Sequence, residues 1–257
     1  MYSVSQGQGP PLVLLHGLFG SLENLAGIGR ILARDFAVTG FDLPHHGRSL
    51  SSEAVSLRNM ADALADALDQ RFGGAPVSVL GHSLGGKVAM EAALLYPQLL
   101  ERLIVLDIAP KAYERRHELI FSAINAVSDA APASRREADG LLRKKIPNLA
   151  VRSFLLKNWQ KQLQNDGEAR FAWRCNMTGL QENYDDLVRE NTSGVFAGPV
   201  YFLCGEHSDY VSATDLAQIK QRFPSARVEW LADTEHWLHA EKPLEVATRV
   251  KSFLVAP

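Results

Sequence analysis

The pentapeptide Gly81-His82-Ser83-Leu84-Gly85 decides how this chain of 257 residues is interpreted. It follows the apolar run Val77-Ser78-Val79-Leu80 and precedes a helix-like run over residues 87–95. A Gly-x-Ser-x-Gly pattern between a strand and a helix is typical of a sharp turn, whose glycines permit the tight backbone that lifts the serine hydroxyl clear of the sheet. Ser83 is therefore the candidate nucleophile. Because so short a pattern also arises by chance, the prediction depends on finding its partners.

Composition limits the classes of function. Hydrophobic residues make up 46% and charged residues 22% of the chain, which is typical of a globular protein, and the formal net charge is -2. A balance so close to neutral gives no general attraction to nucleic acid or to an anionic membrane, so a small-molecule partner is expected. The N-terminus shows no leader pattern and no apolar run reaches membrane-spanning length, so a cytoplasmic location is expected by default. Oligomeric state is left open.

Short apolar runs alternate with helical patterns. Six runs predict buried strands, at residues 12–15, 37–41, 77–80, 103–106, 200–204 and 227–231. A helix is predicted over residues 54–72 from apolar residues at three-to-four spacing, and another at the end of the chain, where Pro243 suits a first turn and Val246, Val250 and Leu254 form a stripe. This alternation predicts an α/β fold with a mostly parallel central sheet flanked by helices, and ligands beyond the carboxyl ends of its strands.

Residues 111–194 break the alternation. They lack clear strand runs and carry helical patterns at residues 119–124 and 154–159, so a helical cap is predicted over 111–194 on a core of residues 1–110 and 195–257. Residues 111–161 hold eleven Lys or Arg against five Asp or Glu. Such a charge run is more often a solvated helical face than a rim that attracts anionic substrates.

A nucleophilic serine needs a histidine base, and we expect that base to be His236. It follows the last predicted strand and a turn-like stretch, which places it at the same sheet edge as Ser83. His239, three residues on, is the competitor and is expected to be structural. His82 is expected to pack beside the tight turn rather than to react.

Attack on a carbonyl creates an oxyanion, which needs preorganised hydrogen-bond donors. The turn His16-Gly17-Leu18-Phe19-Gly20 follows the first predicted strand, and the backbone amides of Leu18 and Leu84 are the predicted pair, with Phe19 as the alternative to Leu18. The predicted pocket is lined by apolar and aromatic side chains, namely Phe19, Trp159, Tyr210, Val211 and Trp237.

These motifs resemble the α/β-hydrolase superfamily. The turn at His16-Gly17, the segment Asp42-Leu43-Pro44-His45-His46-Gly47-Arg48-Ser49, the Ser83 turn and His236 carry the resemblance over nearly the whole chain. More narrowly, the stretches at 16–21, 107–110, 121–127 and 236–243 resemble the small bacterial esterases of the YbfF type, which are related to the ABHD family of animals. The resemblance implies a cofactor-free serine esterase or thioesterase with a four-helix cap, and acyl-CoA thioesters enter as substrates through it alone.

The acid that orients His236 has two candidates. In much of the superfamily it follows the strand before the histidine segment in a Gly-x-x-Asp pattern, but here Ser208 occupies that position and Asp209 comes one residue late. Asp107 closes the strand after the Ser83 strand, where a buried carboxylate needs a strong partner. The resemblance also favours Asp107, with Ser208 assisting by a hydrogen bond. Asp107 is therefore preferred and Asp209 is kept as the alternative.

The predicted function is hydrolysis of an ester or thioester through an acyl-enzyme, by Ser83, His236 and Asp107. Other reactions of the same scaffold remain as alternatives, namely those of a lactonase, a C-C hydrolase or a cofactor-free perhydrolase, because fold and triad do not determine the reaction. A non-catalytic ligand-binding protein is the distant alternative. No metal or nucleotide cofactor is predicted, because the His-Glu-x-x-His, phosphate-loop and dinucleotide patterns are missing. Cys175 and Cys204, the only cysteines, indicate no disulfide scaffold, and Cys204 is expected to be buried.

Overall fold

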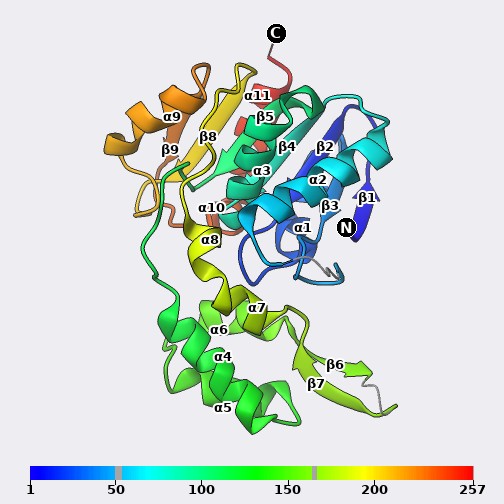
Figure 1. The fold of residues 1–257 in the computed structure, drawn as a ribbon, viewed down its shortest axis with the longest axis vertical. Helices are drawn as coiled ribbons and strands as arrows, with labels where there is room; N and C mark the ends of the chain where they lie inside the picture. Colours follow the sequence, from blue (N-terminus) through cyan, green and yellow to red (C-terminus); the bar gives the residue numbers. More distant parts are fainter. Residues whose placement is uncertain (50–53, 164–166, 257) are drawn as a thin grey trace.

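The computed structural model describes residues 1–49, 54–163 and 167–256, and its main feature is a seven-stranded sheet of order β1-β3-β2-β4-β5-β8-β9 (Figure 1). Its strands are β1 (Ser3–Gln6), β2 (Pro11–Leu15), β3 (Ala37–Phe41), β4 (Val77–His82), β5 (Leu100–Leu106), β8 (Val200–Gly205) and β9 (Arg227–Leu231). Strand β1 pairs antiparallel with β3, and the other neighbours pair in parallel. The six predicted strands are confirmed. Strand β1 was not predicted, because it is a mostly exposed edge strand of polar character.

Helices cover both faces of this sheet (Figure 1). They are α1 (Ala26–Leu32), α2 (Leu57–Phe72), α3 (Leu84–Leu95), α9 (Leu216–Arg222), α10 (Leu238–Glu241) and α11 (Pro243–Leu254). Alternate residues of a strand point to opposite faces, so Val13 and Leu15 join the core with α2 and α3, whereas Leu12 and Leu14 join the core with α1 and α11. The inner strands β2, β4 and β8 are buried on both sides, which is why each reads as a continuous apolar run.

Helix α2 shows how local sequence sets an element's limits. Ser56 precedes it and its hydroxyl accepts a hydrogen bond from the Asn59 amide at 2.9 Å, which satisfies one of the free donors of the first turn. Gly73 ends it in the left-handed conformation, with φ of 65°. The predicted helix therefore starts three residues later than the apolar spacing suggested. At the end of the chain, α11 buries Val246 and Val250 against the sheet, as predicted.

Strand β3, the next strand in sequence after β2, lies on one side of β2 in the sheet, and β4 lies on the other side. The direction of strand order therefore reverses between β2 and β4. In open α/β sheets such a reversal leaves a crevice at the carboxyl ends of the strands. The segments that follow β2, β4, β5, β8 and β9 meet at this edge, and a cap inserted between β5 and β8 lies beyond it (Figure 1). The cap contains α4 (Glu118–Ala130), α5 (Arg135–Arg143), α6 (Leu149–Leu156), β6 (Trp159–Leu163), β7 (Ala169–Trp173), α7 (Met177–Glu182) and α8 (Tyr184–Val188).

The cap is not wholly helical, which corrects the prediction. Helix α6 ends at Leu156, and Trp159 begins a hairpin in which β6 pairs antiparallel with β7. Trp159 lies opposite Trp173, with ring centroids 5.0 Å apart, and its ring also stacks on Phe171 at 6.2 Å. Aromatic contacts of this kind stabilise a short hairpin but leave no apolar run in the sequence. The helical pattern at residues 119–124 does lie in α4, and the division into core and cap domains stays a prediction.

Candidate active site

Ser83 lies on a tight turn between β4 and α3. Its φ of 53° and ψ of -120° are unusual for a residue with a side chain, and such strain persists only where the surroundings enforce it. The glycines make the turn possible, since a Cβ on Gly81 would lie 2.2 Å from the Gly85 carbonyl oxygen, and one on Gly85 would lie 2.3 Å from the Leu15 carbonyl oxygen. The turn therefore has the form that the sequence pattern predicts.

His236 and Asp107 meet at the carboxyl edge of the sheet. His236 follows β9, Asp107 follows β5, and the Nδ1 atom of His236 is 2.7 Å from Oδ2 of Asp107. A carboxylate only accepts hydrogen bonds, so Nδ1 carries the proton and Nε2 is left as the basic nitrogen. Tyr210 stacks on the His236 ring, with centroids 3.8 Å apart and planes inclined by 13°. The ring is thus held both at its edge and on its face.

The fully buried Asp107 carboxylate has further donors. Its Oδ1 accepts from the Gly205 amide at 2.9 Å, and its Oδ2 accepts from the Ser208 hydroxyl as well as from His236. These hydrogen bonds satisfy the oxygens of the buried carboxylate and fix its orientation toward His236. Ser208 therefore occupies the assisting position that the resemblance implied.

Asp209 is not brought to His236. Its carboxylate makes a two-pronged ion pair with Arg116, at 2.9 and 3.1 Å, and its side chain is 75% exposed. Asp209 comes one position after Ser208 in the loop that follows β8, so its side chain points outward, whereas that of Ser208 points toward Asp107. The geometry thus favours Asp107 over the alternative acid.

Two buried histidines hold the turn after β2. His16 donates from Nδ1 to the Gly17 carbonyl at 2.8 Å and accepts at Nε2 from the Leu43 amide at 3.0 Å. His46 accepts at Nε2 from the Phe19 amide at 3.2 Å. Burial lowers the pKa of His16 to about 4 and that of His46 to about 3, so both are neutral and can accept at Nε2 near pH 7.

The amides of Leu18 and Leu84 are free to meet an oxyanion, whereas that of Phe19 is not. The Phe19 amide donates to His46, which removes the alternative donor. Within residues 1–49, 54–163 and 167–256, neither the Leu18 nor the Leu84 amide donates to another group. Leu84 begins α3, where backbone amides have no partner inside the helix. The structure is therefore consistent with the predicted pair.

His82 and His239 are buried beside His236. The His82 Nε2 donates to the His236 carbonyl at 2.9 Å, and the His82 ring lies 4.3 Å from the His239 ring. Burial lowers the pKa of both, that of His239 to about 3. Neither ring contacts Asp107 among the described hydrogen bonds, so His236 is the histidine that this carboxylate orients.

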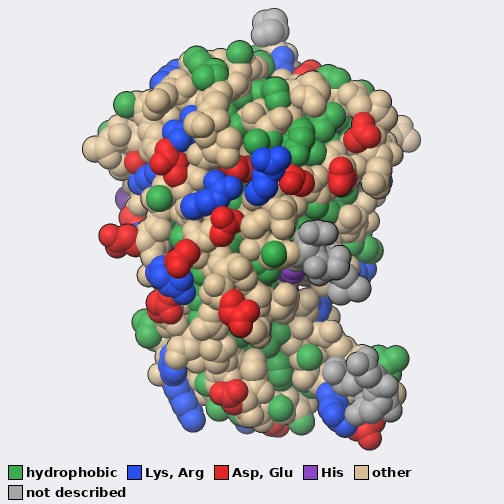
Figure 2. Space-filling view, in the orientation of Figure 1, with side chains coloured by type: hydrophobic (Ala, Val, Ile, Leu, Met, Phe, Trp, Pro, Cys, Tyr) green, Lys and Arg blue, Asp and Glu red, His purple; other side chains and the backbone are tan. Residues whose placement is uncertain are grey.

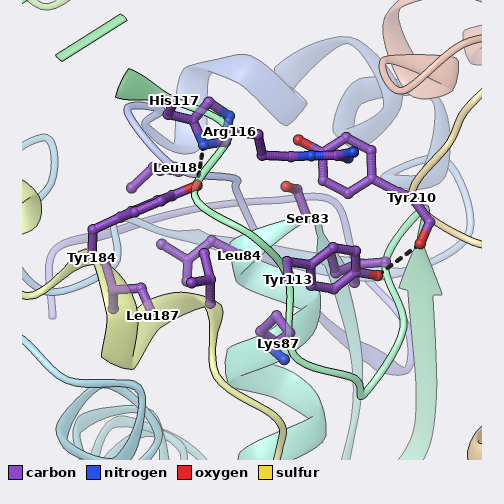
Figure 3. Close-up of a pocket in the computed structure, with 12 residues that line it drawn as sticks. Leu18, Ser83, Leu84, Lys87, Tyr113, Arg116, His117, Tyr184, Leu187 and Tyr210 are labelled. Atoms are coloured by element: carbon purple, nitrogen blue, oxygen red, sulfur yellow. Dashed lines mark hydrogen bonds between the residues drawn. The ribbon is translucent and has the colours of Figure 1, made fainter. Parts of the chain in front are cut away.

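Two cavities meet at Ser83. The larger, of about 580 Å³, is lined by Ser83, His236 and three of the predicted pocket residues, Phe19, Tyr210 and Trp237. The smaller, of about 40 Å³, is lined by Ser83, Leu18 and Leu84 (Figure 3). Trp159 and Val211 line neither cavity, which corrects the prediction. The Trp159 ring packs against Trp173 within the hairpin, and Val211 packs in the core.

The cap contributes residues that the sequence did not single out. His117, which precedes α4, lines both cavities and is hydrogen-bonded to the Tyr184 hydroxyl (Figure 3). Burial lowers its pKa to about 4, so it is a neutral polar group near Ser83. Arg116 lies over the Tyr210 ring at 4.8 Å. No motif marks these residues, because only the folding of the cap over the sheet brings them to Ser83.

Charge is mixed around the cap. Arg115, Arg116 and Arg152 pair with acids, and Figure 2 shows positive and negative side chains interspersed on this face. Lys157 lines the larger cavity together with Glu235 and Glu241. The basic run of residues 111–161 therefore resembles a solvated face more than a rim of one sign.

Among the described residues, one group has the spacing of potential metal ligands. Glu206, His207 and Asp233 offer atoms within 4.8 Å of one another, but all three are exposed. They do not line either cavity, and the Asp233 amide already donates to the Glu206 carboxylate at 3.0 Å. We assign no ion to them. In the described part of the chain, no helix has both the length and the apolar character required to span a membrane.

This sheet, with a serine turn after β4 and a histidine–aspartate pair at the same edge, defines the class of α/β hydrolases. The chain belongs to this family, because the family model described as "Alpha/beta hydrolase family" matches residues 12–249.

Similar proteins agree with that assignment. The esterase YbfF of Escherichia coli (strain K12) is 36% identical over 252 residues, which covers 97% of this chain and 95% of the relative. The sn-1-specific diacylglycerol lipase ABHD11 of Danio rerio is 36% identical over 264 residues, with 98% and 81% covered. A solved structure described as a marine microorganism esterase has a TM-score of 0.91 and 32% identity, with 98% of each chain covered. The predicted fold and resemblance are confirmed, and the similarity groups this chain with esterases and lipases.

Proposed function

We propose that this protein is a serine carboxylesterase, which cleaves its substrate through an acyl-enzyme on Ser83. The observation that carries the proposal is the Asp107–His236 hydrogen bond of 2.7 Å, at a cavity that Ser83 and His236 both line. A serine hydroxyl is a weak nucleophile until a base removes its proton, and an oriented neutral histidine is the usual base. The esterase and lipase names of the similar proteins support the same reaction.

In the acylation step, Nε2 of His236 takes the Ser83 proton as Oγ attacks the ester carbonyl carbon. The amides of Leu18 and Leu84 stabilise the oxyanion, and one such donor is generally worth about 2.7 to 4 kcal/mol. Asp107 stabilises the imidazolium through Nδ1 without itself taking the proton. The carbonyl then re-forms, the C–O bond to the leaving alcohol breaks, and the imidazolium protonates that alcohol.

Deacylation repeats the steps with water. His236 removes a proton from water, the hydroxide attacks the acyl-enzyme carbonyl, and the Ser83 oxygen leaves with the proton that His236 returns. The products are a carboxylic acid and free enzyme. One water molecule is consumed in each cycle, and the proton that His236 takes from it ends on the Ser83 oxygen.

The direct test is covalent labelling combined with ester hydrolysis. A fluorophosphonate should label the protein and stop hydrolysis of 1-naphthyl butanoate, and both should be lost in Ser83→Ala. Ser78→Ala is a matched control, because Ser78 is a buried serine of β4 that lines neither cavity, and it should retain both. Labelling that persists in Ser83→Ala, or a wild type that hydrolyses no ester in a broad panel, would overturn the proposal.

Acyl-CoA thioesters are the finer question within this proposal. The same attack would cleave a thioester, but the wall that combines Lys157 with Glu235 and Glu241 gives no strong attraction for a polyanionic leaving group. We therefore expect kcat/KM for butanoyl-CoA to be below that for an uncharged butanoate ester and to change little between 0.05 and 0.5 M salt. A steep fall with salt would instead indicate recognition of the CoA phosphates.

A further inference from the structure

The two cavities at Ser83 differ in size and in their walls. They share Leu18, Ser83, His117 and Tyr210, so the hydroxyl lies where they join. His236, however, lines only the larger cavity. This asymmetry gives the two sides of a bound ester different surroundings.

The position of His236 assigns a side to each part of the substrate. The leaving oxygen must lie within hydrogen-bond reach of His236 to receive its proton. The leaving alcohol therefore occupies the larger cavity. The acyl chain is attached to the opposite side of the carbonyl carbon, toward the smaller cavity, whose wall includes both Leu18 and Leu84.

The lining of the smaller cavity is mostly apolar, although Arg116, His117 and several tyrosines also contribute to it. Leu84 and Ile108 contribute from the core, and Leu187 and Val188 contribute from α8. Figure 3 shows Leu84 and Leu187 together in this wall. The apolar side chains suit a hydrocarbon chain, and the Arg116 guanidinium, which also lines this cavity, is already paired with the Asp209 carboxylate.

Lys87 does not make this lining polar. It reaches the cavity wall, but its ammonium group donates to the carbonyls of Lys111, at 2.8 Å, and Arg189. Figure 3 shows its nitrogen turned away from the Ser83 hydroxyl, so the methylene stem faces the cavity. The same two hydrogen bonds join the outgoing and returning segments of the cap to α3, which holds the wall formed by α8 in place.

The volume of the smaller cavity limits the acyl chain. About 10 to 15 Å³ of such space holds one water-sized group, so a cavity of about 40 Å³ holds roughly three. We propose that this cavity is the acyl site and that it selects short, uncharged acyl groups of about two to four carbons, while the larger cavity accepts a bulky alcohol. This inference rests on the esterase function proposed above.

The test is a series of 1-naphthyl esters with one leaving group and acyl chains from acetyl to decanoyl. Each carbon that does not fit costs about tenfold or more in a rigid pocket, so kcat/KM should fall at least hundredfold from butanoyl to octanoyl. Acetates of ethanol, benzyl alcohol and 1-naphthylmethanol should differ much less among themselves. An octanoyl ester cleaved as fast as the butanoyl ester would overturn the inference but leave the esterase function intact.

Variants that enlarge one cavity or the other show which cavity holds the acyl chain of the substrate. Leu187→Ala should shift the preferred acyl group toward hexanoyl or octanoyl, and Val188→Ala provides a milder enlargement should the first variant fail to fold. Leu155→Ala is the matched control, because Leu155 is also a buried cap leucine but lines only the larger cavity. If Leu155→Ala shifts the acyl preference and the α8 variants do not, the acyl chain lies in the larger cavity and the assignment is reversed.

Discussion

Three residues of the site have a left-handed backbone although they carry side chains. Phe19, Ser83 and Asp107 have φ of 59°, 53° and 53°. Each follows a strand closely, and the turn changes the direction of the chain within one residue, at a cost of about 1 to 3 kcal/mol. This strained backbone orients the side chain. The turn at Asp107 directs its carboxylate across the end of β8 to Gly205, Ser208 and His236.

Replacing Asp107 by Asn should lower kcat by about four orders of magnitude, because Asn can hold His236 in the wrong tautomer. Asp209→Asn should stay within a few-fold of the wild type, since it loses only an exposed ion pair with Arg116. Steady-state hydrolysis of one short ester measures both. Comparable losses in the two variants, or a loss confined to Asp209→Asn, would contradict the assignment of the acid.

The cap contacts the turn after β2, residues 16–20, as well as covering the cavities; we call this the oxyanion turn after the role proposed for its Leu18 amide. Asn158, between α6 and β6, donates from its side-chain amide to the Phe19 carbonyl, and the Cys175 thiol lies 3.9 Å from the Gly20 carbonyl oxygen. The Phe19 ring packs edge-on against Phe121 of α4, at 5.2 Å. The turn whose Leu18 amide is proposed to face the oxyanion is thus held from the core by His46 and from the cap by Asn158.

Asn158→Ala should lower kcat for a short ester about tenfold or more and leave KM within about twofold. The variant leaves the buried Phe19 carbonyl without its donor, which costs about 1 to 3 kcal/mol and loosens the turn. Asn125→Ala is the control, because Asn125 is an exposed cap residue whose amide donates to Gln181 at the surface. Binding of a trifluoromethyl ketone, which mimics the oxyanion, should weaken in parallel with kcat; unchanged binding would show that Asn158 does not position the turn.

Several histidines around the site are buried in the interior of the molecule and are neutral. Burial lowers the pKa of all of them, to about 4 for His16 and His117, to about 3 for His46 and His239, and in the same direction for His82. In the unfolded chain these rings bind protons near pH 6.5. The folded state therefore excludes protons that the unfolded state takes up.

The free energy of unfolding should consequently fall as the pH drops below about 6.5. A depressed histidine pKa contributes stability that is complete above the unfolded value and is lost toward the folded one, by up to about 1.4 kcal/mol per pH unit for each ring. Urea unfolding at pH 7.5, 6.5 and 5.5 measures the slope. His46→Gln retains an acceptor for the Phe19 amide and should make the slope shallower; a stability that is flat over this range would contradict buried neutral rings.

Much of the fold was predictable from local pattern. The inner parallel strands read as apolar runs because both of their faces are covered, and the serine turn was recognisable because only glycine fits at Gly81 and Gly85. His236 could be chosen among eight histidines because chain order after the last strand places it at the sheet edge. The hairpin that begins at Trp159 could not be predicted in this way, because its stability comes from pairing with Trp173 across the strands.

The composition of the site beyond its motifs was decided by tertiary structure. Asp107 and Asp209 are both carboxylates near strand ends, and only the backbone turn at Asp107 and the ion pair of Asp209 with Arg116 separate them. Likewise, His117 and Asn158 carry no motif and reach Ser83 or the oxyanion turn only because the cap folds back over the sheet. Sequence patterns report local periodicity and chain order, whereas the direction of a side chain and the walls of a cavity depend on packing between distant segments.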